Sequence, residues 1–172
     1  AVKLYLATDA LDDVRWATER ALIDGVSLPD SALTGARSIE ASLAWLGGFV
    51  CAAAMPVFVS LEATTANAAE AEAERLGRAP DHVVIQLPFA GSAVQAVRAA
   101  RTGVAFLFVD VDRIDAGGGE SATVLQQART LLDHGACETE LVAVFLGLGA
   151  WIVSCAAAGA DAAVVGAAAL RA

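Results

Sequence analysis

Phe106-Leu107-Phe108-Val109-Asp110-Val111 is a short run with apolar residues on both faces, and the helical pattern of Ser121–His134 follows it. A parallel strand that helices cover on both sides has this composition. The same order recurs along the chain. Other apolar runs begin near Val2, Asp24, Pro56, His82, Glu140 and Asp161, and helical periodicity marks Leu11–Ile23, Ser38–Ala53, Asn67–Leu76 and Ser92–Arg101. The repetition predicts an α/β fold with parallel strands, in either a closed barrel or an open sheet.

Length and charge narrow the classes of function. The 172 residues suit one domain, which we expect to span residues 1–172. A formal net charge of −9 argues against nucleic acid or an anionic membrane surface as a partner. Ala41–Leu61 and Leu141–Ala160 are long enough to cross a bilayer, but their acidic flanks and internal glycines argue against a membrane protein.

The cysteines and glycines do not follow the patterns of common cofactor sites. Cys51, Cys137 and Cys155 lack the paired spacing of a zinc or redox site, and their odd number fits a reducing cytoplasm. The turn after the first strand, Ala7–Ala10, has no glycine with which to bind a dinucleotide. We therefore expect a cytoplasmic protein with no metal and no cofactor, and the start of the chain lacks the pattern of a signal peptide.

Several stretches resemble the small transaldolases and fructose-6-phosphate aldolases. They are Lys3–Asp9, Gly25–Ser27, Phe58–Thr65, Val83–Pro88 and Val111–Gly118. The resemblance covers nearly the whole chain. It implies a (β/α) barrel of the TIM type, with any active site at the carboxyl ends of the strands.

The chain is shorter than this family between Gly103 and Asp112. The resemblance implies that roughly 20 residues, about one βα unit, are absent there, which leaves about seven strands, and we expect the chain to lack the long C-terminal helix of the family. Because a barrel closes with a fixed tilt and stagger, we expect either a distorted seven-stranded barrel or a gap covered by a partner subunit in a homo-oligomer.

The chain also departs from the family at the reactive position. The resemblance places a Schiff-base lysine where this chain has Gln86. The only lysine of the chain, Lys3, begins the first strand and is therefore expected at the end of the barrel away from the site. Amine catalysis has no candidate residue.

Strand alternation suggests which residues replace the lysine. If Gln86 points inward like its family counterpart, then Ser60, Glu62, Asp110 and Asp112 share the interior or its mouth. Carboxylates held close together in a poorly solvated cavity favour protonation of one of them, which suits a general acid. We predict Asp110 and Asp112 as proton donor and acceptor, with Glu62 tuning them.

We expect the remaining predicted site residues to bind the substrate. Gln86 and Ser60 would hydrogen-bond a carbonyl group, and Phe108 and Phe145 would line an apolar cavity. The resemblance implies an anion contact for Arg113. As an alternative, Arg113 forms a purely structural ion pair with Asp112 and Asp115 at the end of the strand.

Two functions follow from this pattern. The first is an enzyme without a Schiff base, a lyase, isomerase or cyclase that performs acid–base chemistry on an apolar small molecule of secondary metabolism. The second is a catalytically dead relative that binds a ligand or serves as a scaffolding subunit.

Overall fold

The computed structural model describes residues 2–28, 44–45, 47–49, 51, 53, 55–60, 83–86, 106–135, 138–144, 154 and 156–171, with the backbone alone at residues 60 and 83–86. The chain divides into two compact units, one formed by Ala1–Tyr5 with Phe89–Ala172 and the other by Leu6–Pro88. Strand β1 (Lys3–Ala7) contributes residues to both units.

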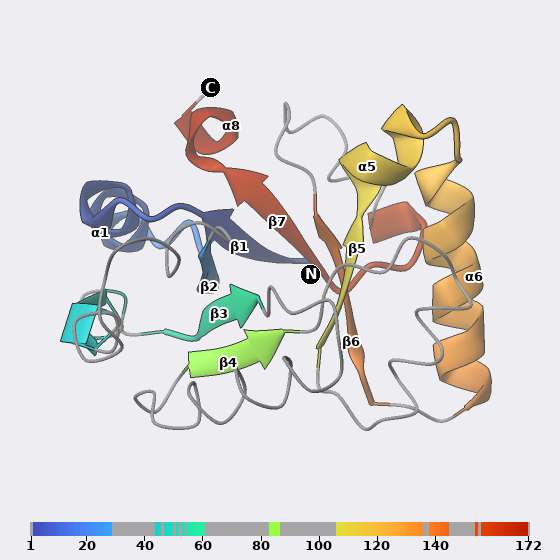
Figure 1. The fold of residues 1–172 in the computed structure, drawn as a ribbon, viewed down its shortest axis with the longest axis horizontal. Coiled ribbons are helices and arrows are strands. Elements are labelled where there is room, and N and C mark those ends of the chain that lie inside the picture. Colours follow the sequence, from blue (N-terminus) through green and yellow to red (C-terminus); the bar gives the residue numbers. More distant parts are fainter. Residues whose placement is uncertain are drawn as a thin grey trace. The chain divides into compact units, whose positions relative to one another are not determined.

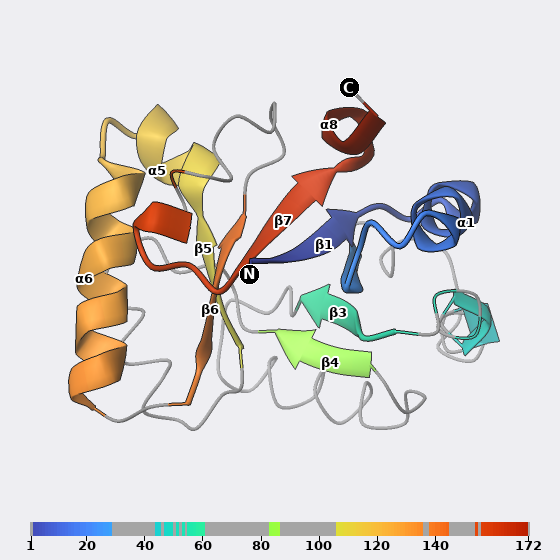
Figure 2. The ribbon, with the colours of Figure 1, turned by 180° about the vertical axis from the view of Figure 1, so that it is seen from behind.

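The unit that contains the C-terminal half has a parallel sheet with the strand order β1-β7-β6-β5 (Figure 1). Its elements are β5 (Phe106–Asp110), α5 (Val111–Ala116), α6 (Ser121–His134), β6 (Glu140–Val144), β7 (Ala162–Gly166) and α8 (Ala167–Arg171). Helix α6 lies alongside β5 and β6 in both views (Figure 1, Figure 2).

The side chains of this sheet separate onto two faces, because successive residues of a strand point in opposite directions. Leu107 and Val109 of β5, with Leu141 and Ala143 of β6, form a buried cluster with α6. Phe106, Phe108 and Asp110 therefore lie on the opposite face of β5. The face that packs against α6 is apolar. The opposite face carries the carboxylate of Asp110 at the end of β5.

Helix α6 spans Ser121–His134 and confirms the helix predicted from the periodicity. Leu125, Ala128 and Leu132 are buried at helical spacing against the sheet. Gly135 follows the last turn, and its N–H donates to the carbonyl oxygen of Leu131.

The unit formed by Leu6–Pro88 has the parallel strand order β4-β3-β2. Its elements are α1 (Leu11–Glu19), β2 (Gly25–Leu28), β3 (Val57–Ser60) and β4 (Val83–Gln86). Val26 and Phe58 are fully buried, as the apolar runs predict for strands covered on both faces.

Two predicted boundaries are corrected. Helix α1 ends at Glu19 rather than at Ile23, because Ala21 takes a φ of 51°, in the left-handed region that ends a right-handed helix. Strand β5 ends at Asp110 rather than at Val111. The helices predicted at Asn67–Leu76 and Ser92–Arg101 lie outside the described residues.

The described part of the chain contains seven strands, the number predicted for a barrel short of one βα unit. None of its described helices combines the length and the hydropathy that crossing a lipid bilayer requires.

Candidate functional site

Asp110 stands at the carboxyl end of β5, where the strand passes directly into α5. Its Oδ1 accepts a hydrogen bond of 3.0 Å from the backbone N–H of Arg113. This contact satisfies one of the N–H groups that the first turn of a helix leaves without a partner in the helix itself. The carboxyl group is half-buried and held in one place by the helix that it caps.

The residues beside Asp110 on the same face of the sheet are apolar and buried. The register places Val144 of β6 opposite Asp110, and Val164 of β7 opposite Val144. The preceding row on the same face consists of Phe108, Val142 and Ala162, all buried. Asp110 thus lies at the edge of a buried apolar wall, which in the described part of the sheet consists of Phe108, Val142, Val144, Ala162 and Val164.

Asp112 and Arg113 lie in α5, so the alternation of strand β5 does not extend to them. Helix α5 buries Val111 and Ile114 and exposes Asp112 and Arg113. The expected strand was one residue too long because the side chain of Asp110 caps a helix there, and the alternation pattern contains no information on capping.

Asp115 makes a contact that the sequence interpretation missed. Its Oδ1 accepts from the backbone N–H of Ser121 and its Oδ2 from the Ser121 hydroxyl, both at 3.0 Å. The side chain of Asp115 thereby joins α5 to the first residue of α6. The available signal was local, a carboxylate six residues before the serine that opens an apolar helical run.

Ser60 and Gln86 are the last residues of β3 and β4, and the register pairs them. The backbone thus brings these two predicted substrate-binding residues side by side at the carboxyl ends of adjacent strands. Glu62 and Phe145 lie outside the described residues. The expected meeting of Glu62 with Asp110 and Asp112 stays a prediction.

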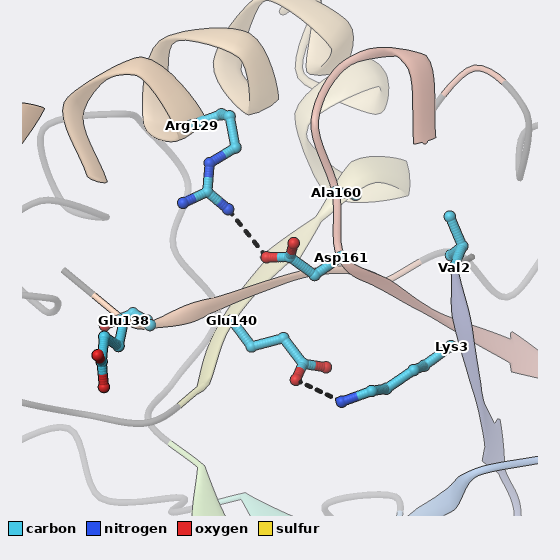
Figure 3. A pocket seen from close by; sticks show the side chains of 8 residues that line it. Val2, Lys3, Arg129, Glu138, Glu140, Ala160 and Asp161 are labelled. Atoms are coloured by element: carbon cyan, nitrogen blue, oxygen red, sulfur yellow. Dashed lines mark hydrogen bonds and ion pairs between the residues drawn. The ribbon is translucent and has the colours of Figure 1, made fainter. Parts of the chain in front are cut away.

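A hollow of about 580 Å³ lies in the C-terminal unit, at the starts of β1, β6 and β7 and so at the opposite end of these strands from Asp110 (Figure 3). It is lined by Val2, Lys3, Arg129, Glu138, Thr139, Glu140, Ala160 and Asp161. Glu140 and Asp161 are the acids that flank the apolar run Leu141–Ala160, and the sequence pattern predicts no site role for them.

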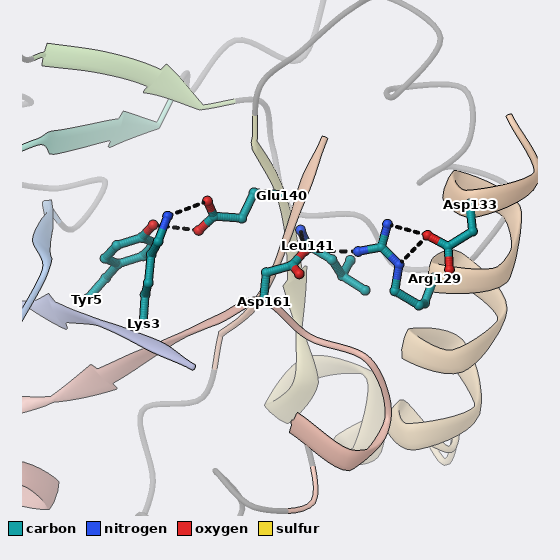
Figure 4. A network of polar contacts seen from close by, with 7 residues as sticks. All are labelled: Lys3, Tyr5, Arg129, Asp133, Glu140, Leu141 and Asp161. Carbon is teal, nitrogen blue, oxygen red and sulfur yellow. Dashed lines mark hydrogen bonds and ion pairs between the residues drawn. The ribbon is translucent and has the colours of Figure 1, made fainter. Parts of the chain in front are cut away.

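Glu140 is the centre of one polar network beside this hollow (Figure 4). Its Oε2 lies 3.0 Å from Nζ of Lys3, and its Oε1 accepts a hydrogen bond of 2.6 Å from the hydroxyl of Tyr5. This ion pair holds the Lys3 side chain at the start of β1, at the opposite end of the strands from Asp110. The prediction that Lys3 begins the first strand is confirmed.

Asp161 is the centre of the second network. Its Oδ2 accepts from the backbone N–H of Leu141 at 2.8 Å and from Nη1 of Arg129 at 2.9 Å, and Arg129 also pairs with Asp133 of α6. Figure 4 shows these contacts running from the helix to the strands. These contacts join α6 to the starts of β6 and β7, at the opposite end of the strands from Asp110.

No group of three or more His, Cys, Asp or Glu side chains is placed to hold a metal ion within the part of the chain that the structure describes.

Comparison with known proteins gives distant relatives, and no family model matches the chain. A probable transaldolase of Phenylobacterium zucineum (strain HLK1) is 24% identical over 187 residues, which cover 95% of this chain and 85% of that protein. A probable transaldolase of Bartonella tribocorum (strain CIP 105476 / IBS 506) is 25% identical over 194 residues, with 99% and 88% covered. These similarities support a transaldolase-like relationship.

Solved structures with the same fold share little sequence with the chain. A thiamine phosphate pyrophosphorylase from Pyrococcus furiosus superposes with a TM-score of 0.59 at 15% identity, over 99% of this chain and 88% of that one. FabK from Thermotoga maritima gives 0.61 at 12% identity, over 94% and 57%. The likeness is one of fold, and a partial α/β barrel fits the parallel strands described above.

Proposed function

We propose that this chain is a transaldolase-like enzyme that uses no Schiff base and catalyses acid–base chemistry on an apolar small molecule. The reaction would be a cyclisation, isomerisation or dehydration of a secondary-metabolic intermediate, without a metal or cofactor. The observation that carries the proposal is the position of Asp110, a fixed carboxyl group at the end of β5 beside an apolar wall.

The geometry at Asp110 supports a role in proton transfer. Oδ1 makes its contact with the backbone of α5, and we assign Oδ2 to the substrate. A carboxyl group anchored through one oxygen can exchange a proton through the other without losing its position. Asp112, in the first turn of α5, would be the second acid–base group, and Glu62 would tune the pair.

The remaining predicted residues would orient the substrate. Ser60 and Gln86, adjacent at the ends of β3 and β4, would hold its carbonyl oxygen. Phe108 and Phe145 would contact its apolar part, and Arg113 an acidic substituent.

The surroundings of Lys3 support chemistry that does not proceed through an imine. Lys3 is the only lysine of the chain, begins β1, and is paired with Glu140. The carboxamide nitrogen of Gln86 cannot replace it, because resonance delocalises its lone pair. Neither position therefore supplies an amine at the carboxyl ends of the strands, where the proposed chemistry takes place.

Reductive trapping tests the absence of a Schiff base. The chain is incubated with cyanoborohydride and either fructose 6-phosphate or dihydroxyacetone, with the unfolded chain as baseline and a lysine-bearing transaldolase as positive control. We expect no adduct above the baseline. An adduct on Lys3 of the folded chain, found by peptide mass spectrometry, would contradict the proposal.

Substrate depletion tests the role of Asp110. Wild type and Asp110→Asn are incubated with an extract of apolar metabolites from the producing cells, and mass spectrometry follows the compounds consumed. We expect compounds that wild type converts and the variant does not. Equal conversion by both proteins would remove Asp110 from the chemistry.

The capping contacts favour a second candidate function, a non-catalytic relative that binds a ligand or a subunit. Asp110 and Asp115 both stabilise local structure, and that role alone accounts for acids at these positions. A compound that protects both wild type and Asp110→Asn against thermal unfolding, with no conversion by either, would support this alternative.

We further propose that the chain forms a homo-oligomer in the cytoplasm. A barrel short of one βα unit leaves strand edges that need cover, and a second copy can supply it. Light scattering on the purified chain measures the mass, and a monomer at micromolar concentration would contradict the proposal.

A further inference from the structure

We infer that Asp115 is a positioning residue for Asp110. The inference rests on the proposed function, because it gives Asp115 the task of fixing the carboxyl group that the proposal uses. The hydrogen bonds of the Asp115 side chain go to Ser121, so its effect on Asp110 would pass through helix α5.

Asp110 and α5 move together. The strand passes into the helix without a loop, and the cap contact joins the Asp110 side chain to the backbone of the first turn. Any tilt of the six-residue helix would displace Arg113 N–H and with it Oδ1 of Asp110. A helix this short has little stability of its own.

Helix α5 is fixed at both ends. Val111 and Ile114 pack into the buried cluster shared by the sheet and α6. At the other end, Asp115 accepts two hydrogen bonds from Ser121, the buried first residue of α6. Because α6 has fourteen residues and is anchored by the core, it serves as the fixed support for α5.

The turn between α5 and α6 is tight. The N–H groups of Gly117, Gly118 and Gly119 donate to carbonyl oxygens of Arg113, Asp115 and Ile114. A Cβ atom on Gly119 would lie 2.9 Å from Cγ2 of Ile114, so the glycine permits this close packing. The turn thus closes tightly enough for the Asp115 carboxylate to reach Ser121.

Amide hydrogen exchange, measured residue by residue with NMR, tests the inference. The reporter is the amide proton of Arg113, which the Asp110 carboxyl group holds. In Asp115→Ala we expect its protection to fall about tenfold, since a hydrogen bond to a charged group is lost and α5 opens more often. The amide of Leu132, in the last turn of α6, should keep its protection.

Two matched variants sharpen the test. Asp115→Asn retains an acceptor oxygen for Ser121 and should restore most of the Arg113 protection. Thr123→Ala removes an exposed contact with Glu120 in the same first turn of α6 and should leave Arg113 unchanged.

Unchanged Arg113 protection in Asp115→Ala would overturn the inference. A parallel fall at Arg113 and Leu132 would also overturn it, because Asp115 would then support the whole unit. The measurement requires no substrate, so it separates failure of this inference from failure of the proposed chemistry, which Asp110→Asn reports through turnover.

Discussion

The hydroxyl of Tyr5 donates a hydrogen bond of 2.6 Å to Oε1 of Glu140, a residue 135 positions away in the chain. Tyr5 is buried, and the Glu140 side chain is 17% exposed. The ammonium group of Lys3 reaches the second oxygen of the same carboxylate, but its own side chain is 55% exposed. The two partners of Glu140 therefore differ in their access to water.

Tyr5→Phe should destabilise the protein more than Lys3→Met. Removing the buried hydroxyl leaves a carboxylate oxygen without its donor, which costs about 1.5–3 kcal/mol in free energy of unfolding. Removing the exposed ammonium costs about 0–1 kcal/mol, because water and salt screen the pair. Urea denaturation of both variants measures the difference, and the reverse order would contradict the assignment.

Gly159→Ala should destabilise the protein, whereas Gly48→Ala should not. Gly159 has a φ of +102°, and a Cβ atom there would lie 2.7 Å from Cγ of Arg129, whose guanidinium binds Asp161. We expect a loss of about 1–3 kcal/mol from backbone strain. Gly48 lies in a helical segment with open space at its Cβ, so alanine should be neutral or stabilise by up to about 1 kcal/mol. Thermal unfolding compares the two, and equal midpoints would argue against strain at Gly159.

Leu132→Ala should cost about 2–5 kcal/mol in free energy of unfolding, because Leu132 is 1% exposed in the cluster between α6 and the sheet and its truncation leaves a cavity. Its neighbour Leu131 is 42% exposed and provides the matched control. Leu131→Ala should cost less than about 1 kcal/mol. Chemical denaturation distinguishes them, and similar losses would mean that α6 packs on a different face.

Asp110→Asn should retain the stability of wild type and lose turnover. Asparagine caps a helix about as well as aspartate, whereas Asp110→Ala loses the cap and about 0.5–2 kcal/mol. Thermal unfolding follows the three proteins, and the metabolite assay follows conversion. If Asp110→Asn unfolds as readily as Asp110→Ala, the charge itself is structural and the second candidate function gains support.

The positions of the described helices and strands were largely predictable, because they depend on nearby residues. Helix α6 follows from apolar residues at three- and four-residue spacing. Strand β5 follows from β-branched and aromatic residues on both faces. The end of β5 was not predictable from this pattern, since it depends on one side chain of Asp110 turning back to a backbone N–H.

The sequence by itself determined that parallel strands alternate with helices and that the chain has one lysine, at the start of the first strand. Hydrophobic periodicity and residue identity require no knowledge of distant contacts. The tertiary structure alone decided that Glu140 meets Tyr5 and that Val144 stands opposite Asp110. Those pairings depend on strand order and register, which bring together residues far apart in the chain.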